Sequence, residues 1–178
     1  FFQSVVVRTA GFNTTNFAIL STPTLLIFLL LMFIGASPGG TGGGIKTTTF
    51  AAIFLSAIAT IRGKKHVEVF KQTIPNDLLY KAFSIFLFSL SVVFLGTLIL
   101  SFTEPNLPLL HLAFEEVSAF ATVGSSTGIT PNISIAGKYV LIASMFIGRV
   151  GVFTLALALS KKTISTNYKY LDGYVMIG

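Results

Sequence analysis

Two short turns of threonine and glycine carry the residue types that could bind a dehydrated cation. They are Thr9-Ala10-Gly11 and Thr122-Val123-Gly124, separated by 113 positions. Glycine can present its backbone carbonyl without a clash from a Cβ atom, and rings of carbonyls can replace the hydration shell of an ion. We therefore predict that backbone carbonyls of each turn, and of the residue after it, bind a cation: Thr9, Ala10, Gly11, Phe12, Thr122, Val123, Gly124 and Ser125.

A longer internal repeat surrounds these turns. Met32-Phe33-Ile34-Gly35 returns as Met145-Phe146-Ile147-Gly148 at the same offset of 113 positions, with no gap. Each unit thus places a Thr-x-Gly turn at a constant distance from a glycine on a following apolar segment. An isolated Thr-x-Gly is often only a structural turn, but two copies in register favour a narrow constriction. Thr122-Val123-Gly124 resembles the Thr-Val-Gly of potassium-channel filters, in which backbone carbonyls bind the ion. Neither turn continues as Gly-Tyr-Gly, as those filters do, so we expect a shorter filter with fewer ion sites.

A glycine-rich segment follows the first unit and predicts a gate. It interrupts an apolar run, and exposed backbone groups at membrane depth are tolerated only where they face water or protein. The expected gate residues are Gly39, Gly40, Thr41, Gly42, Gly43, Gly44 and Lys46. A plain cytoplasmic turn is the alternative. A phosphate-binding loop is disfavoured, because Ile45 separates Gly44 from Lys46 and that motif joins them directly.

Arg149 occupies the repeat position of Ala36, immediately after the shared Phe-Ile-Gly. A buried arginine in a membrane is costly and usually faces carbonyls or acids inside the protein. We expect Arg149 to lie in the middle of a span, to face the permeation path and to hold the glycine-rich segment closed. Glu115 and Glu116 could attract cations at the outer mouth, or could be solvated or capping residues.

The elements that position these residues are those of a membrane protein. The chain of 178 residues is 53% apolar and 10% charged, with a mean hydropathy of +0.84, whereas soluble domains carry about 25% charged residues. Apolar runs predict two membrane spans, at 78–102 and at 139–159. Asp77 is the expected N-cap of the first. A third run, 17–36, resumes at 45–61 after the glycine-rich break, as two segments or as one broken helix.

A short helix at 109–120 leads into the second turn and is too short to span, so we expect a re-entrant hairpin. The predicted fold class is an all-α membrane protein of repeated helix–pore helix/filter–helix units. We expect three parts: the last part of one unit at residues 1–72, the whole of the next unit at 73–162, and a cytoplasmic tail at 163–178. The sequence shows no nucleophile–base pair or metal-ligand cluster and has no cysteine, which argues against an enzyme.

The distribution of charge predicts a multi-pass protein of the cell membrane. Lysine and arginine gather at 62–77 and after the last span, while 101–137 has none. By the positive-inside rule, the 62–77 loop and the C-terminus face the cytoplasm. The net charge of +6 is then explained by the membrane surface, and no nucleic-acid partner is expected.

Three stretches together resemble the Trk/Ktr/HKT superfamily of potassium transporters, and above all the membrane subunit of bacterial Ktr-type systems. They are 7–14 (VRTAGFNT), 39–46 (GGTGGGIK) and 145–149 (MFIGR). The resemblance implies four pore units in one polypeptide, of which this chain holds the end of the third and all of the fourth. A missing N-terminal half would supply the other two filter segments. It also implies a gating loop contacted by Arg149, a homodimer, and a cytosolic nucleotide-binding RCK ring.

From the residues and the resemblance we expect a potassium-translocating subunit with channel-like permeation, with sodium as a candidate modulator. A non-conducting structural subunit and a membrane-embedded nucleotide-binding protein using Gly39–Thr47 are the alternatives.

Overall fold

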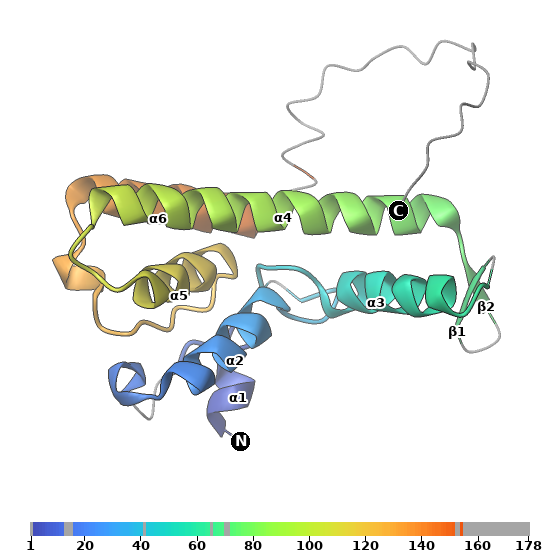
Figure 1. Ribbon diagram of the computed structural model, residues 1–178, viewed down its shortest axis with the longest axis horizontal. Coiled ribbons are helices and arrows are strands. Elements are labelled where there is room, and N and C mark those ends of the chain that lie inside the picture. Colours follow the sequence, from blue (N-terminus) through green and yellow to red (C-terminus); the bar gives the residue numbers. More distant parts are fainter. Residues whose placement is uncertain are drawn as a thin grey trace, which may run out of the picture.

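The computed structural model describes residues 2–12, 16–40, 42–64, 66–69, 72–151 and 154, and shows a mostly helical chain (Figure 1). The α-helices are α1 (Phe2–Val6), α2 (Thr22–Phe33), α3 (Thr47–Ile61), α4 (Asn76–Thr103), α5 (Leu109–Phe120) and α6 (Ile135–Val150). Two 3₁₀ turns, η1 (Phe17–Ile19) and η2 (Thr130–Asn132), precede α2 and α6. The all-α prediction missed one antiparallel hairpin, β1 (Val67–Val69) and β2 (Gln72–Ile74).

Helix α4 is the one described helix that is long and apolar enough to cross a membrane. Its 28 residues extend about 42 Å at ~1.5 Å per residue. Most of the apolar side chains in its middle are exposed, among them Leu87, Phe88, Leu90, Phe94, Leu95 and Leu98, as expected for a lipid-facing helix. The cap prediction was wrong: Pro75 is the N-cap, and Asp77 lies in the first turn, where its charge suits the helix dipole.

The internal repeat is visible in the fold. The turns η1 and η2 are related by the same offset of 113 positions, and so are the first residues of α2 and α6, which both follow a serine N-cap, Ser21 and Ser134. The two units then diverge. Helix α2 ends at Phe33, three residues before the expected end at Ala36, whereas α6 continues to Val150. Most of the predicted 151–159 extension, and the tail at 163–178, lie outside the described residues.

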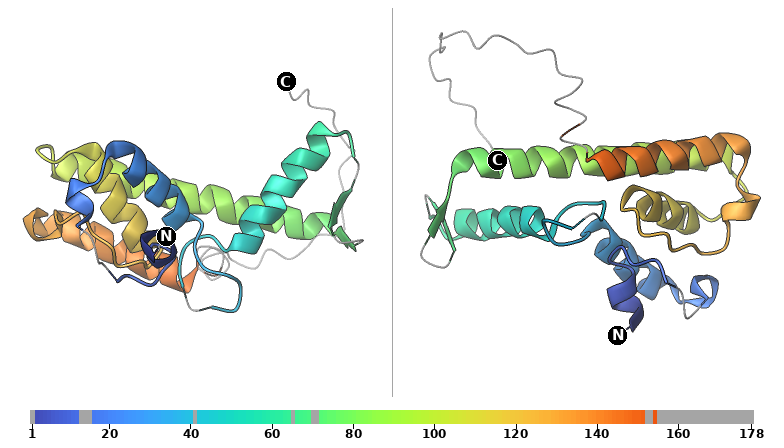
Figure 2. Two further views of the ribbon diagram at one scale, coloured as in Figure 1. Left: turned by 90° about the horizontal axis from the view of Figure 1, so that it is seen from below. Right: turned by 180° about the vertical axis from the view of Figure 1, so that it is seen from behind.

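Helix α5 has the predicted bounds and lies at the centre of the packing. It is covered by α2 on one side and by α4 and α6 on the other (Figure 2). The first side holds an aromatic cluster in which the ring of Phe17 lies 5.5 Å from that of Phe114 and 5.8 Å from that of Phe28. The second side buries Leu100, Leu112 and Leu141. This packing fixes the pore helix from which the second turn leaves.

Helix α3 packs against the other half of α4, and the β1–β2 hairpin covers the end of this pair (Figure 1). A small cluster of Ala59, Val67 and Leu79 joins the three elements. The sequence left open whether the apolar stretches at 17–36 and 45–61 form two segments or one broken helix. They form two separate helices, α2 and α3, joined by the glycine-rich loop at 34–46.

Candidate functional site

The two Thr-x-Gly turns lie directly against each other. A Cβ atom added to Gly11 would be 2.5 Å from the carbonyl oxygen of Val123, and one added to Gly124 would lie 4.0 Å from the Cα atom of Gly11. Two segments more than a hundred residues apart are thus joined backbone to backbone, with no side chain between them. This proximity is required of neighbouring parts of one constriction.

The backbone of both turns has the same unusual conformation. φ is +71° at Thr9 and +55° at Thr122, and it is +72° at Gly11 and +83° at Gly124. For a β-branched residue such a φ is an outlier that surroundings must hold in place, at a cost of about 1–3 kcal/mol. The middle residue of each turn has negative φ. Alternation in the sign of φ rotates successive peptide planes, so that neighbouring carbonyls can face the same side.

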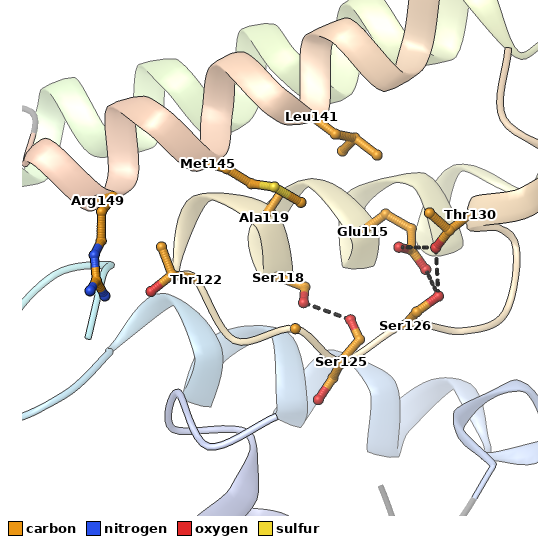
Figure 3. Close-up of a pocket in the computed structure, with 11 residues that line it drawn as sticks. Glu115, Ser118, Ala119, Thr122, Ser125, Ser126, Thr130, Leu141, Met145 and Arg149 are labelled. Carbon is orange, nitrogen blue, oxygen red and sulfur yellow. Dashed lines mark hydrogen bonds between the residues drawn. The ribbon is translucent and has the colours of Figure 1, made fainter. Parts of the chain in front are cut away.

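Ser125, the residue after the second turn, is bonded to α5. Its carbonyl oxygen accepts a buried hydrogen bond of 2.6 Å from the Ser118 hydroxyl of α5 (Figure 3). The Ser125 carbonyl therefore points toward α5. At the matching position of the first unit, the side chain of Phe12 is 73% exposed.

Glu115 is buried behind the second turn rather than solvated, with 6% of its surface exposed. Its Oε1 atom accepts hydrogen bonds from the Ser126 hydroxyl at 2.6 Å and from the Thr127 backbone N–H at 2.9 Å. Its Oε2 atom accepts one from the Thr130 hydroxyl at 2.9 Å (Figure 3). The carboxyl group thus ties α5 to the segment that leaves the filter.

Glu116 does not lie at the mouth either, because it is fully buried between helices. The Ser144 hydroxyl of α6 donates a hydrogen bond to its Oε1 atom. Its carboxyl group also packs against Gly96 of α4, where a Cβ atom would collide with it. Glu116 therefore joins α5 to α4 and α6.

The glycine-rich loop lies immediately below the two turns. The backbone N–H of Gly43 donates a 2.8 Å hydrogen bond to the Thr122 hydroxyl, and a Cβ atom on Gly43 would lie 2.8 Å from that side chain. A Cβ atom on Gly42 would lie 2.6 Å from the Thr9 hydroxyl oxygen. Only glycine fits this close to both threonines, so the loop closes against the equivalent residue of each turn.

The loop is also held from within. A parallel bridge pairs Ile34 with Ile45, and the Gly35 N–H donates to the Ile45 carbonyl at 2.8 Å. The Lys46 ammonium donates to the carbonyls of Gly42 at 2.6 Å and Gly40 at 3.1 Å. These contacts close the two ends of the loop and place a positive charge beneath the filter. Thr41 lies outside the described residues.

Arg149 lies beside the loop, but it is in the last described turn of α6 rather than in the middle of a span. Gly151, with φ of +88°, caps the helix two residues later. A cavity of about 350 Å³ is lined by Arg149 and by Gly40, Gly42, Gly44, Lys46 and Gly148. The structure thus brings Arg149 to the glycine-rich loop at the point where the two units diverge.

A phosphate-binding loop follows a strand, whereas this loop follows the helix α2. Its backbone also faces the two filter threonines. Sequence reasoning missed Ser118 and the buried role of Glu115. The available signal was the spacing of Glu115 and Ser118 at i and i+3, which places both on one face of the short helix.

Comparisons with known proteins agree with this geometry. The TrkH family model, described as a cation transport protein, matches residues 1–170. The Ktr system potassium uptake protein B of Bacillus subtilis is 44% identical over all of this chain and 40% of its own length. The potassium/sodium uptake protein NtpJ of Enterococcus hirae is 38% identical over all of this chain and 41% of its own.

The crystal structure of the potassium transporter TrkH from Vibrio parahaemolyticus superposes with a TM-score of 0.75 at 25% identity, over 87% of this chain and 35% of that one. This chain thus spans about 40% of the length of these curated relatives. The repeated filter turns, the loop beneath them and the match over nearly the whole chain lead to one conclusion: the chain belongs to the TrkH family of cation transport proteins, a family of transporters and not of enzymes.

Proposed function

We propose that this chain forms half of the pore of a potassium-uptake subunit, through which K⁺ passes by channel-like permeation. The observation that carries the proposal is the contact between Gly11 and the Val123 carbonyl, with Gly42 and Gly43 closing beneath both threonines. Two equivalent turns with the same left-handed residues form one rim, and a glycine loop lies directly below it. That is the arrangement of a filter and its gate.

Six carbonyl-bearing positions are proposed to bind the ion, together with Phe12 at the outer end of the first turn: Thr9, Ala10, Gly11, Thr122, Val123 and Gly124. Backbone carbonyls replace water around K⁺. We leave out Ser125, because its carbonyl is bonded to Ser118. The membrane potential would drive uptake, since it supplies about 2.3 kcal/mol per charge for each 100 mV.

The proposed gate consists of Gly39, Gly40, Thr41, Gly42, Gly43, Gly44 and Lys46, with Arg149 beside them. In the arrangement observed, Gly43 is bonded to Thr122, and Lys46 stabilises the loop through two of its carbonyls. Lys46 and Arg149 also place two positive charges on the path of a cation. Opening requires the loop to leave the threonines, and it breaks these hydrogen bonds.

The rest of the pore would come from outside this sequence. Two further filter turns from the same polypeptide would complete the ring, since the relatives are more than twice as long. A second copy, a cytosolic nucleotide-binding RCK ring and a lipid bilayer are the proposed partners. The 62–77 hairpin region would face the cytoplasm. Sodium is proposed as a modulator; the Enterococcus relative is named a potassium/sodium uptake protein.

The test is growth rescue of a potassium-uptake-deficient bacterium by the polypeptide that carries this chain, with Gly124→Asp as the variant. The space at Gly124 is open apart from Gly11, and aspartate tolerates positive φ better than most residues. The variant can therefore fold while its side chain fills the rim. Rescue at low potassium that Gly124→Asp abolishes supports conduction. Absence of rescue by the wild type favours a non-conducting subunit, and equal rescue by the variant shows that the turn is not the filter.

A further inference from the structure

Glu115 accepts hydrogen bonds from three residues of the segment that follows the second turn. Besides its bonds to Ser126, the Thr127 N–H and Thr130, it accepts a longer bond of 3.3 Å from the Thr127 hydroxyl. The Ser126 and Thr130 hydroxyls also lie 2.9 Å from each other. The carboxyl group is thus the centre of a polar network behind the second turn.

Ser118 lies one helical turn further along α5 than Glu115. It holds the same segment at Ser125, the residue that directly follows the second turn. Its hydroxyl donates to the Ser125 carbonyl at 2.6 Å. The contacts of Glu115 and Ser118 both join α5 to the segment at 125–130, which follows the second turn (Figure 3). Because α5 is packed on both sides, it is a fixed support for this chain.

The first unit has no counterpart to these two side chains. At the repeat offset, Phe2 stands in place of Glu115 and Val5 in place of Ser118. Neither side chain can donate or accept a hydrogen bond. The first turn is bonded to α1 through the backbone N–H groups of Ala10 and Gly11, which donate to the Val6 carbonyl at 3.0 and 3.3 Å. Gly11 also packs onto the Val123 carbonyl of the second turn.

We propose that Glu115 and Ser118 form a brace that sets the position of the outer rim for both turns. The second turn is held by α5, and the first turn is held both by α1 and by its contact with the second turn. Glu115 and Ser118 are therefore positioning residues for ion selection, and they act from one unit only. The proposal rests on the proposed potassium conduction.

The physical consequence concerns the size of the ion. A rim held by several buried hydrogen bonds keeps its carbonyls at the separation that suits K⁺. If the brace is removed, the segment at 125–130 gains freedom, and the carbonyls can close around the smaller Na⁺. Loss of one buried bond to a charged group changes an equilibrium by about tenfold or more, so the preference for K⁺ over Na⁺ is expected to fall by about that factor.

The experiment measures initial uptake of rubidium tracer by cells that express the full polypeptide, with competing K⁺ or Na⁺, normalised to the amount of protein in the membrane. The variants are Glu115→Gln, Ser118→Ala and Thr130→Val. Glu68→Gln is the matched control, since Glu68 is an exposed carboxylate of the hairpin, paired with Lys64. We expect each brace variant to bring the inhibition constants for K⁺ and Na⁺ closer together, while the control keeps them apart.

A double variant adds a second readout. Because Glu115 and Thr130 act through one hydrogen bond, Glu115→Gln combined with Thr130→Val is expected to change the preference little more than Glu115→Gln alone. The proposal is overturned if the ratio of inhibition constants stays at the wild-type value while only the amount of protein falls. If Glu115→Gln fails to reach the membrane, Ser118→Ala and Thr130→Val decide the question, because each removes a single hydroxyl. Wild-type uptake in the same cells separates this outcome from a failure of conduction itself.

Discussion

Replacing Lys46 with methionine is expected to open the gate. The lysine ammonium holds the glycine-rich loop through two carbonyl bonds, one part-buried of 2.6 Å to Gly42 and one exposed of 3.1 Å to Gly40. Methionine keeps an unbranched chain of similar length but removes both bonds and the positive charge.

The size of the effect follows from these two contacts. A hydrogen bond to a charged group contributes about 1.5–3 kcal/mol, and the exposed bond to Gly40 adds little because water competes for it. A net loss of roughly 2 kcal/mol from the closed arrangement raises the ratio of open to closed loop roughly 30-fold. Removal of the charge acts in the same direction, since a cation beneath the filter repels K⁺.

The assay is rubidium tracer uptake under conditions in which the wild type is mostly closed, per amount of protein in the membrane. Lys64→Met is the matched control, because Lys64 is an exposed lysine of the hairpin region whose partner is Glu68. We expect a rise for Lys46→Met of an order of magnitude or more and none for the control. Uptake by Lys46→Met equal to or below the wild type would refute the reasoning that these bonds hold the loop shut.

Three further changes test other parts of the account. Gly11→Ala is expected to abolish potassium uptake, because its Cβ atom would lie 2.5 Å from the Val123 carbonyl oxygen and φ is +72°; growth at low potassium measures this, and normal growth would contradict the backbone contact. Arg149→Ala is expected to raise unstimulated flux, because it removes a charge beside the loop; an unchanged flux would show that Arg149 has no part in the gate. The third change is in pH. Side-chain and backbone hydrogen bonds from Ser134 hold the pKa of Glu104 below its usual range. This contribution to stability is therefore present above the carboxyl's unfolded pKa and is lost as the pH falls through the lowered folded value. The melting temperature of Glu104→Gln in detergent should thus approach that of the wild type on acidification, and a constant difference would refute this assignment.

The sequence was sufficient to predict helix α5 residue for residue and the long helix to within a few residues. Pro108 marks the start of α5, and the turn at Thr122 follows soon after its end. The offset of 113 positions also predicted which turns would be equivalent, and the left-handed conformation at Thr9 and Thr122 shows that equivalence in the backbone. These features are local or periodic, and a single sequence contains them.

Other features depend on contacts that no local pattern contains. Glu115 and Glu116 looked like surface charges, but the helices packed around α5 bury both. Helix α2 ends early at Phe33 because Gly35 packs beneath the Gly43 carbonyl and Ile34 pairs with Ile45. The hairpin at 67–74 was missed because the charged residues around it indicated only a loop. In each case the partner lies in another element, and it can be identified only after the chain has folded.

The most direct test of the central claim is ion flux through the purified full polypeptide in liposomes. Rubidium tracer should enter wild-type vesicles loaded with K⁺, external K⁺ should compete far better than Na⁺, and Gly124→Asp vesicles should take up no more tracer than empty ones. Flux that survives Gly124→Asp unchanged, or no flux in the wild type, would contradict the assignment of the two Thr-x-Gly turns as a potassium filter.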